Sequence, residues 1–193
     1  MVVKAADGSD NPEKETKGDA VPSHRLRVLV VRHAVAEERG PFGRTGQPEA
    51  ARPLTRGGRR KMRRAARGLA CLVPRLDRLA TSPLTRAVET ADIVARACGK
   101  PKTQRLAPLA PGKPPGGVLA WLKDQRPGGT VALVGHEPDL GVFVSWALTG
   151  LRESFVPLKK GGACLLEFGG EVKPGRAVLL WLLRPSQLRA VGE

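Results

Sequence analysis

Apolar residues along this chain follow two spacings, which alternate from about residue 25 to the C-terminus. Runs rich in apolar residues predict strands at 28–31, 76–80, 130–134, 163–168 and 177–183, of which the first is expected to be buried. Between these runs, apolar residues recur every three or four positions, which predicts helices over 62–73, 84–98, 118–123 and from Pro138 to about residue 147. This order predicts an α/β fold, a three-layer α/β/α sandwich with a mostly parallel central sheet.

Local signals refine two features of this layout. Ser82 and Pro83 precede the helix 84–98, and a serine N-cap followed by a proline at the first helical position is a common helix start. The strand at 130–134 is apolar without interruption, as expected for a strand buried on both faces of a parallel sheet. In such sheets ligands bind at the carboxyl ends of the strands.

The length and composition place these elements in one soluble domain. Residues 1–24 are polar and lack periodic apolar positions, so we expect a disordered tail followed by a single domain over 25–193. Apolar residues make up 41% of the chain, but no run approaches the length of a membrane span. The N-terminus also lacks the pattern of a secretory signal. We therefore expect a cytoplasmic protein with no membrane association.

The charge is unevenly distributed. The whole chain has a formal net charge of +15. Three lysines and five acidic residues give residues 1–24 a net charge of −2, so the remaining residues carry +17. A surface this basic attracts phosphorylated substrates, acidic proteins and nucleic acid. Aromatic residues are only 4% and tyrosine is absent, which disfavours nucleic acid as a partner because stacking platforms are scarce. One basic helical face could bind an acidic partner, although a solvated outer face is the favoured interpretation; its residues are Arg59, Arg60, Lys61, Arg63, Arg64 and Arg67.

Cysteine and tryptophan residues favour structural roles. Cys71, Cys98 and Cys164 are odd in number and lie among apolar neighbours, which predicts small buried side chains rather than a disulfide or a metal site. We therefore expect no metal. The three tryptophans, Trp121, Trp146 and Trp181, are expected in the core.

Candidate chemistry gathers at the carboxyl ends of the predicted strands. His33 follows the strand 28–31, and His136 follows the strand 130–134. Arg32 adjoins the first histidine, and Arg86 lies one turn into the helix after strand 76–80. These four side chains should meet at one edge of the sheet. Arginine matches the geometry of phosphate oxygens, and imidazole can act as a nucleophile, an acid or a base near neutral pH, so the pattern favours phosphate chemistry.

Four ordered segments resemble the histidine phosphatase superfamily. They are Leu29-Val30-Val31-Arg32-His33-Ala34, Arg52-Pro53-Leu54-Thr55, Thr81-Ser82-Pro83-Leu84-Thr85-Arg86-Ala87-Val88-Glu89-Thr90, and Val134-Gly135-His136-Glu137-Pro138-Asp139. The resemblance covers residues 27 to about 183, and the length is similar to the short phosphohistidine phosphatases of the SixA type, which implies that there is no cap domain.

The resemblance implies a role for each matching residue. It makes His33 the nucleophile, Arg32 and Arg86 phosphate clamps, Arg52 an additional phosphate ligand, and His136 a neighbour of the phosphoryl group. It implies a phosphatase that needs neither a cofactor nor a metal and that removes phosphate from phosphohistidine in a protein. Two alternatives stay open: a phosphatase of a small phosphorylated metabolite or of polyphosphate, and a non-catalytic module that binds phosphate or nucleic acid.

The chain departs from the family pattern at two points. Glu89 replaces the usual glutamine three residues after Arg86, where it either orients that guanidinium or weakens its charge. No Asp or Glu occurs between Asp92 and Asp124, so the carboxylic acid of larger relatives is missing. A protonated phosphoramidate leaves readily without such an acid, which favours phosphohistidine as the substrate. Other acids remain as substitutes, namely Glu37, Glu38 and Glu137.

Overall fold

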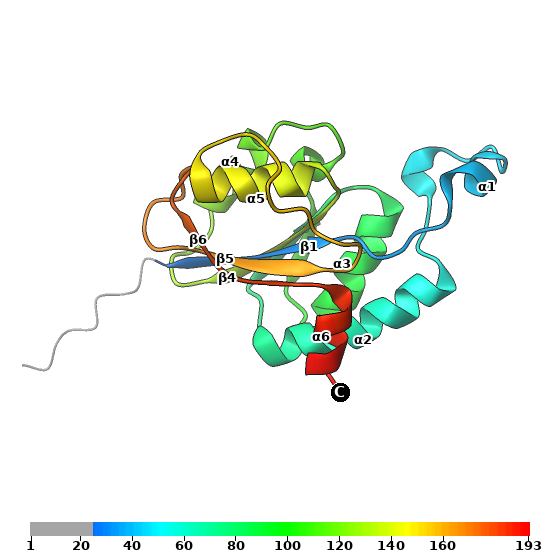
Figure 1. Cartoon of the computed structure of the whole chain (residues 1–193), viewed down its shortest axis with the longest axis horizontal. Helices are drawn as coiled ribbons and strands as arrows, with labels where there is room; N and C mark the ends of the chain where they lie inside the picture. The colour runs from blue at the N-terminus through cyan, green and yellow to red at the C-terminus, as the bar shows by residue number, and fades with distance from the viewer. Residues whose placement is uncertain (1–24) are drawn as a thin grey trace, which may run out of the picture.

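A single mixed sheet forms the centre of the molecule. The computed structural model describes residues 25–193, so the predicted disordered tail, 1–24, lies outside the described residues. The sheet has the strand order β3-β2-β4-β1-β5-β6 (Figure 1). Its strands are β1 (Leu26–Arg32), β2 (Arg78–Thr81), β3 (Lys102–Arg105), β4 (Thr130–Gly135), β5 (Ala163–Phe168) and β6 (Ala177–Leu183). The first four strands run parallel, and only β5 is antiparallel to both of its neighbours. The predicted mostly parallel sheet is confirmed.

Helices cover both faces of this sheet. Figure 1 shows α4 and α5 on one side and α2, α3 and α6 on the other, which confirms the three-layer sandwich, and residues 25–193 contain no cap domain. The helices are α1 (Arg39–Gly43), α2 (Arg56–Leu72), α3 (Thr85–Ala97), α4 (Gly116–Lys123), α5 (Asp139–Thr149) and α6 (Pro185–Val191), with short 3-10 turns at Glu49–Ala51 and Ala107–Leu109. Within residues 25–193, none of the helices has both the length and the apolar content to span a bilayer.

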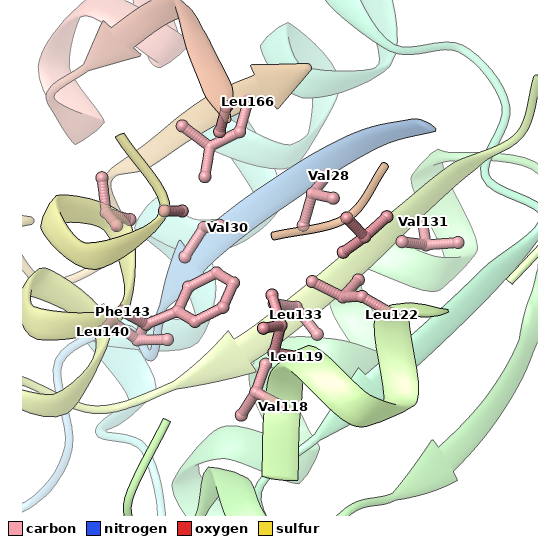
Figure 2. Close-up of a cluster of buried hydrophobic side chains, with 14 of the residues drawn as sticks. Val28, Val30, Val118, Leu119, Leu122, Val131, Leu133, Leu140, Phe143 and Leu166 are labelled. Carbon is pink, nitrogen blue, oxygen red and sulfur yellow. The ribbon is translucent and has the colours of Figure 1, made fainter. Parts of the chain in front are cut away.

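Alternating side chains of the central strands divide the core into two halves. Val28 and Val30 of β1 pack with α4 and α5, whereas Leu29 and Val31 belong to the cluster with α2, α3 and α6. Figure 2 shows the first half, where Phe143 of α5 lies against β1 and β4. Because residues 28–31 of β1 are fully buried on both faces, the site at its carboxyl end is held by a rigid element.

Three elements were not predicted, namely the short helix α1, the strand β3 and the helix α6. The strand β3 consists of Lys-Thr-Gln-Arg, is largely exposed and lies at the edge of the sheet, so it has no apolar pattern and owes its conformation to pairing with β2. The helix α6 has only seven residues, and Leu188 is its buried residue, so the helix is too short to show an apolar periodicity. It packs on α2 at Gly68, where an added Cβ would collide with the carbonyl oxygen of Leu188.

Three local expectations need correction. The helix α3 begins at Thr85, so Ser82 is not its N-cap and Pro83 is not its first residue. Ser82 is instead held at the end of β4, where its N–H donates to the carbonyl of Val134 at 2.9 Å. Cys71 is exposed because it lies on the solvent side of the last turn of α2, while Cys98 and Cys164 are buried as expected. Trp121 and Trp146 are in the core, but Trp181 on the edge strand β6 is only partly buried.

Candidate active site

The topology of the sheet brings the two predicted histidines together. Strands β1 and β4 are parallel neighbours, and the N–H of His33 donates to the carbonyl of Gly135 at 3.0 Å. The rings of His33 and His136 consequently lie with their centroids 5.0 Å apart. Both side chains are buried, with 7% and 3% of their surface exposed, so they are shielded from bulk solvent.

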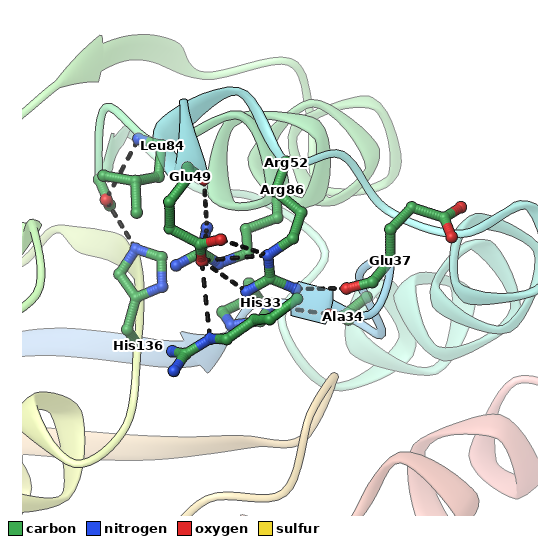
Figure 3. A network of polar contacts seen from close by, with 10 residues as sticks. His33, Ala34, Glu37, Glu49, Arg52, Leu84, Arg86 and His136 are labelled. Carbon is green, nitrogen blue, oxygen red and sulfur yellow. Dashed lines mark hydrogen bonds and ion pairs between the residues drawn. The ribbon is translucent and has the colours of Figure 1, made fainter. Parts of the chain in front are cut away.

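The other predicted residues converge on the same place. Arg86 lies in the first turn of α3, after β2, and is 3% exposed, and Arg52 follows the 3-10 turn Glu49–Ala51 (Figure 3). Arg32, His33, Arg52, Arg86 and His136 all line one cavity of about 420 Å³. Further residues that line it are Glu37, Glu38, Arg39, Glu137 and Lys160.

The hydrogen bonding of His33 defines its tautomer. Nδ1 lies 2.7 Å from the carbonyl oxygen of Ala34, and because a carbonyl only accepts, the proton is on Nδ1. Nε2 therefore carries the lone pair. Burial lowers the pKa of His33 to about 4, and the nearby Arg86 and Arg32 add to this effect against the Ala34 hydrogen bond. At neutral pH the ring is uncharged and Nε2 is available as a nucleophile.

His136 is also neutral but has a different environment. Burial lowers its pKa to about 3, and the neighbouring His33 ring and arginines act in the same direction. Its Nε2 lies 2.7 Å from Ser82 Oγ, which in turn accepts the N–H of Leu84 at 3.4 Å. This arrangement favours donation from the Ser82 hydroxyl to Nε2, which leaves the His136 proton on Nδ1. Nδ1 is buried and has no hydrogen-bond partner among the described residues.

The arginines are anchored and retain unused donors. Arg32 donates from one terminal nitrogen to the carbonyl of Leu158 at 2.7 Å. The Nε atoms of Arg32 and Arg86 are buried and, within residues 25–193, have no partner. Buried donors without partners are uncommon in folded proteins. These two Nε atoms and Nδ1 of His136 are three such donors on residues that line one cavity, which indicates a site prepared for an anion.

A carboxylate that the sequence did not reveal completes the network. Glu49 accepts from Arg52 through Nε and a terminal nitrogen at 2.8–3.0 Å, and it pairs with Arg86 at 3.4 Å (Figure 3). Another Arg52 nitrogen donates to the carbonyl of Glu37. Three of the five N–H groups of Arg52 are thus held by the protein, and two are left for a ligand. The hydrogen bonds from Arg52 lower the pKa of Glu49, so this carboxylate is ionised and unsuited to act as an acid. Its spacing of three residues before Arg52 is the only signal in the sequence.

Glu89 performs neither of the two roles considered for it. Its carboxylate accepts the N–H of Leu54 at 2.9 Å and pairs with Arg59 at 2.7 Å, so it fixes the segment after Arg52 to α3 rather than contacting Arg86. Arg59 is therefore not part of a uniformly solvated basic face, whereas the other five cations of that face are exposed.

The three acids considered as proton donors differ in their surroundings. Glu137 accepts the N–H of Leu158 at 2.8 Å, and the N–H of Gly141 also faces its carboxylate. Burial raises the pKa of Glu137, but its oxygens serve as acceptors that fix Leu158, the residue whose carbonyl anchors Arg32. Glu37 and Glu38 are exposed at the cavity.

No metal-binding cluster accompanies these groups in the part of the chain that the structure describes. Within residues 25–193, no three His, Cys, Asp or Glu side chains are placed to hold a metal ion. The positive charge at the site comes from arginine and lysine side chains.

Comparison with known proteins agrees with this geometry. Residues 28–107 match the model of the histidine phosphatase superfamily (branch 1). An uncharacterized protein of Picosynechococcus sp. is 36% identical over 146 residues, which are 75% of this chain and 86% of that protein. The chain belongs to the histidine phosphatase superfamily. Its fold and family together support phosphatase activity.

Solved structures share the fold. The protein histidine phosphatase SixA complexed with tungstate superposes with a TM-score of 0.71 at 24% identity, covering 84% of this chain and 99% of that chain. A mutant phosphoserine phosphatase of Entamoeba histolytica in complex with phosphoserine has a TM-score of 0.59 at 16% identity, covering 84% of this chain and 99% of that one. At these identities, both comparisons show that the helices and strands have the same arrangement.

Proposed function

We propose that the chain is a metal-independent phosphatase that removes phosphate from phosphohistidine in proteins through a phosphohistidine intermediate on His33. The observation that carries this proposal is the bond from Nδ1 of His33 to the carbonyl of Ala34, which leaves Nε2 neutral and unprotonated inside a cluster of cations. Arg32, Arg52, Arg86 and the Nδ1–H of His136 would hold the three equatorial oxygens of the phosphoryl group. Their charge would take the place of a metal ion.

The reaction divides into two displacements. In the first, Nε2 of His33 forms a bond to phosphorus as the bond from phosphorus to the substrate imidazole breaks. The substrate ring is protonated on its other nitrogen, so it leaves as a neutral imidazole and needs no strong acid. In the second, water attacks the phosphorus, its proton passes to solvent or to phosphate, and the bond to Nε2 breaks, which regenerates His33.

The surroundings of the acids support phosphohistidine over phosphate esters. An alkoxide leaves as a strong base and needs a positioned acid. Of the carboxylates at the site, Glu49 is ionised, and Glu137 is engaged with backbone N–H groups. Only the exposed Glu37 and Glu38 remain as carboxylic acids that could protonate a leaving group. Their presence at the cavity would favour the alternative substrates, a small phosphorylated metabolite or polyphosphate.

Trapping the intermediate tests the mechanism. The full-length protein is mixed with phosphoramidate and quenched in alkali, because phosphohistidine is stable in alkali and labile in acid. We expect phosphate on His33 by mass spectrometry, loss of turnover in His33→Ala, and partial recovery in His33→Gly when imidazole is added. Appreciable turnover by His33→Ala without imidazole would refute covalent catalysis.

A substrate panel tests the substrate class separately. Turnover is compared among a phosphohistidine-carrying protein, a phosphomonoester and polyphosphate. We expect the phosphohistidine protein to have the highest kcat/KM. A higher kcat/KM for the phosphomonoester or for polyphosphate would favour the hypothesis of a metabolite or polyphosphate phosphatase. Inactivity on all three substrates would favour a binding module.

A further inference from the structure

A second cavity lies beside the catalytic one and shares Lys160 with it. This cavity has a volume of about 220 Å³ and forms where the first half of α2, the segment after β1, the turn before β5 and the helix α6 meet. Met62, Ala65 and Pro185 give it an apolar floor. None of these side chains has a part in the phosphate site described above.

Three cations surround this floor. They are Lys61 on α2, Lys160 on the turn before β5, and Arg189 on α6. Among residues 25–193, no acidic side chain lines the cavity, and none of these three cations forms an ion pair. Three cations that converge without a counter-charge create a positive potential that favours an anionic group.

The two cavities are fixed relative to each other by the backbone. The N–H of Gly161 lies 3.1 Å from the carbonyl oxygens of both Arg32 and His33, so the turn that carries Lys160 is tied to the segment that carries the nucleophile. Gly161 has a φ of +76°, and a Cβ at this position would stand 3.5 Å from Met62 Sδ. Glycine therefore both permits this turn and leaves the floor of the cavity open.

We propose that the second cavity binds an acidic side chain of the protein substrate while its phosphohistidine occupies the catalytic cavity. This inference rests on the proposed function, since it concerns the recognition of the same substrate. The apolar floor suits the methylene groups of glutamate or aspartate, and the cations suit its carboxylate. A second phosphate group would use the cations but has no apolar part to place on Met62 and Pro185.

Peptide kinetics with matched variants test the proposal. Two phosphohistidine peptides are compared, one with glutamate and one with glutamine on both sides of the phosphohistidine. The variant Lys61→Ala/Arg189→Ala removes two cations of the cavity and spares the shared Lys160. The control Arg60→Ala/Arg63→Ala removes two exposed cations of α2 that do not line either cavity.

We expect the unmodified protein to prefer the glutamate peptide by about tenfold in kcat/KM, mainly through KM. The cavity variant should reduce this preference to less than about twofold, and the control variant should keep it. Hydrolysis of p-nitrophenyl phosphate, which has no second anionic group, should be the same in all three proteins. No preference for glutamate, or an equal loss of preference in the control, would overturn the proposal.

A second readout separates this inference from the proposed function. The unphosphorylated glutamate peptide should inhibit p-nitrophenyl phosphate hydrolysis, and the cavity variant should weaken this inhibition by about fivefold. If phosphohistidine peptides are not hydrolysed but this inhibition is observed, the substrate assignment fails and the acidic site stands. If instead tripolyphosphate inhibits in a way that depends on Lys61 and Arg189 and the peptide does not, the cavity takes a second phosphate and the proposal fails.

Discussion

The two buried histidines should make the protein markedly less stable at pH 5 than at pH 7. Their pKa values in the folded state, about 4 for His33 and about 3 for His136, lie below the ordinary value of 6.5. Between pH 7 and pH 5 the unfolded chain therefore binds protons that the folded chain excludes. The sign is fixed by this difference: stability is complete above pH 6.5 and is lost as the pH falls toward the folded pKa values.

The magnitude follows from the same values. At pH 5 an unfolded histidine is almost fully protonated, while the folded ones remain largely neutral. Proton linkage then costs about 2 kcal/mol of unfolding free energy for each histidine between pH 7 and pH 5. Carboxylates at their ordinary pKa contribute little in this range, so the two histidines should dominate.

Urea unfolding of the full chain at pH 7, 6 and 5 measures this effect. His33→Gln and His136→Gln should each lose about half of the pH dependence, whatever their stability at pH 7. NMR of the unmodified protein should show the imidazoles of His33 and His136 neutral down to pH 5. Equal stability of the unmodified protein at pH 7 and pH 5, or an imidazole of His33 that titrates near pH 6.5, would refute the proposal that a neutral His33 is the nucleophile.

Three further predictions concern the site. EDTA should leave phosphatase activity unchanged, because Arg32, Arg52 and Arg86 provide the charge that a metal would supply; activity lost in EDTA and restored by a divalent ion would contradict this. Glu49→Ala should lower kcat/KM about tenfold and lower Tm, because Arg52 loses two of its anchoring contacts, with Glu49→Gln intermediate; kcat/KM unchanged in Glu49→Ala would argue against the positioning role. In a series from phosphoramidates through aryl to alkyl phosphates, kcat/KM should fall steeply. His136→Ala should lower kcat/KM by the same factor for all three substrate classes, because this histidine is neutral. A loss confined to alkyl phosphates would show that His136 acts as an acid.

The residues whose positions follow from strand order could be predicted from the sequence. The apolar runs before His33 and His136 identify strands that are buried on both faces. In a parallel sheet such strands end at the same edge. Arg86 follows from the same reasoning, because it lies just after a third parallel strand. These side chains could be placed together before any distance was known.

The parts that depend on tertiary contacts could not be predicted. The strand β3 has no apolar pattern because it is an exposed edge, and its pairing partner determines its conformation. Glu49 lies in a polar loop, and only the folded chain shows that it faces Arg52 and Arg86. Ser82 has the sequence signature of a helix cap, yet its hydroxyl bonds to His136, a residue 54 positions away. Helix-capping propensity depends on neighbouring residues and cannot predict a hydrogen-bond partner so distant in the sequence.

The place of β4 in the sheet has a consequence for how the protein acquires activity during synthesis. This strand lies between β1 and β2, although it begins only at Thr130. A nascent chain that ends before this residue already contains His33, Arg52 and Arg86, but it has no strand to join β1 to β2. His33 after β1 and Arg86 after β2 are therefore not joined through the sheet until β4 has left the ribosome. Because these contacts span so much of the chain, we expect folding to be slow relative to local helix formation and phosphate binding to appear in a single late step.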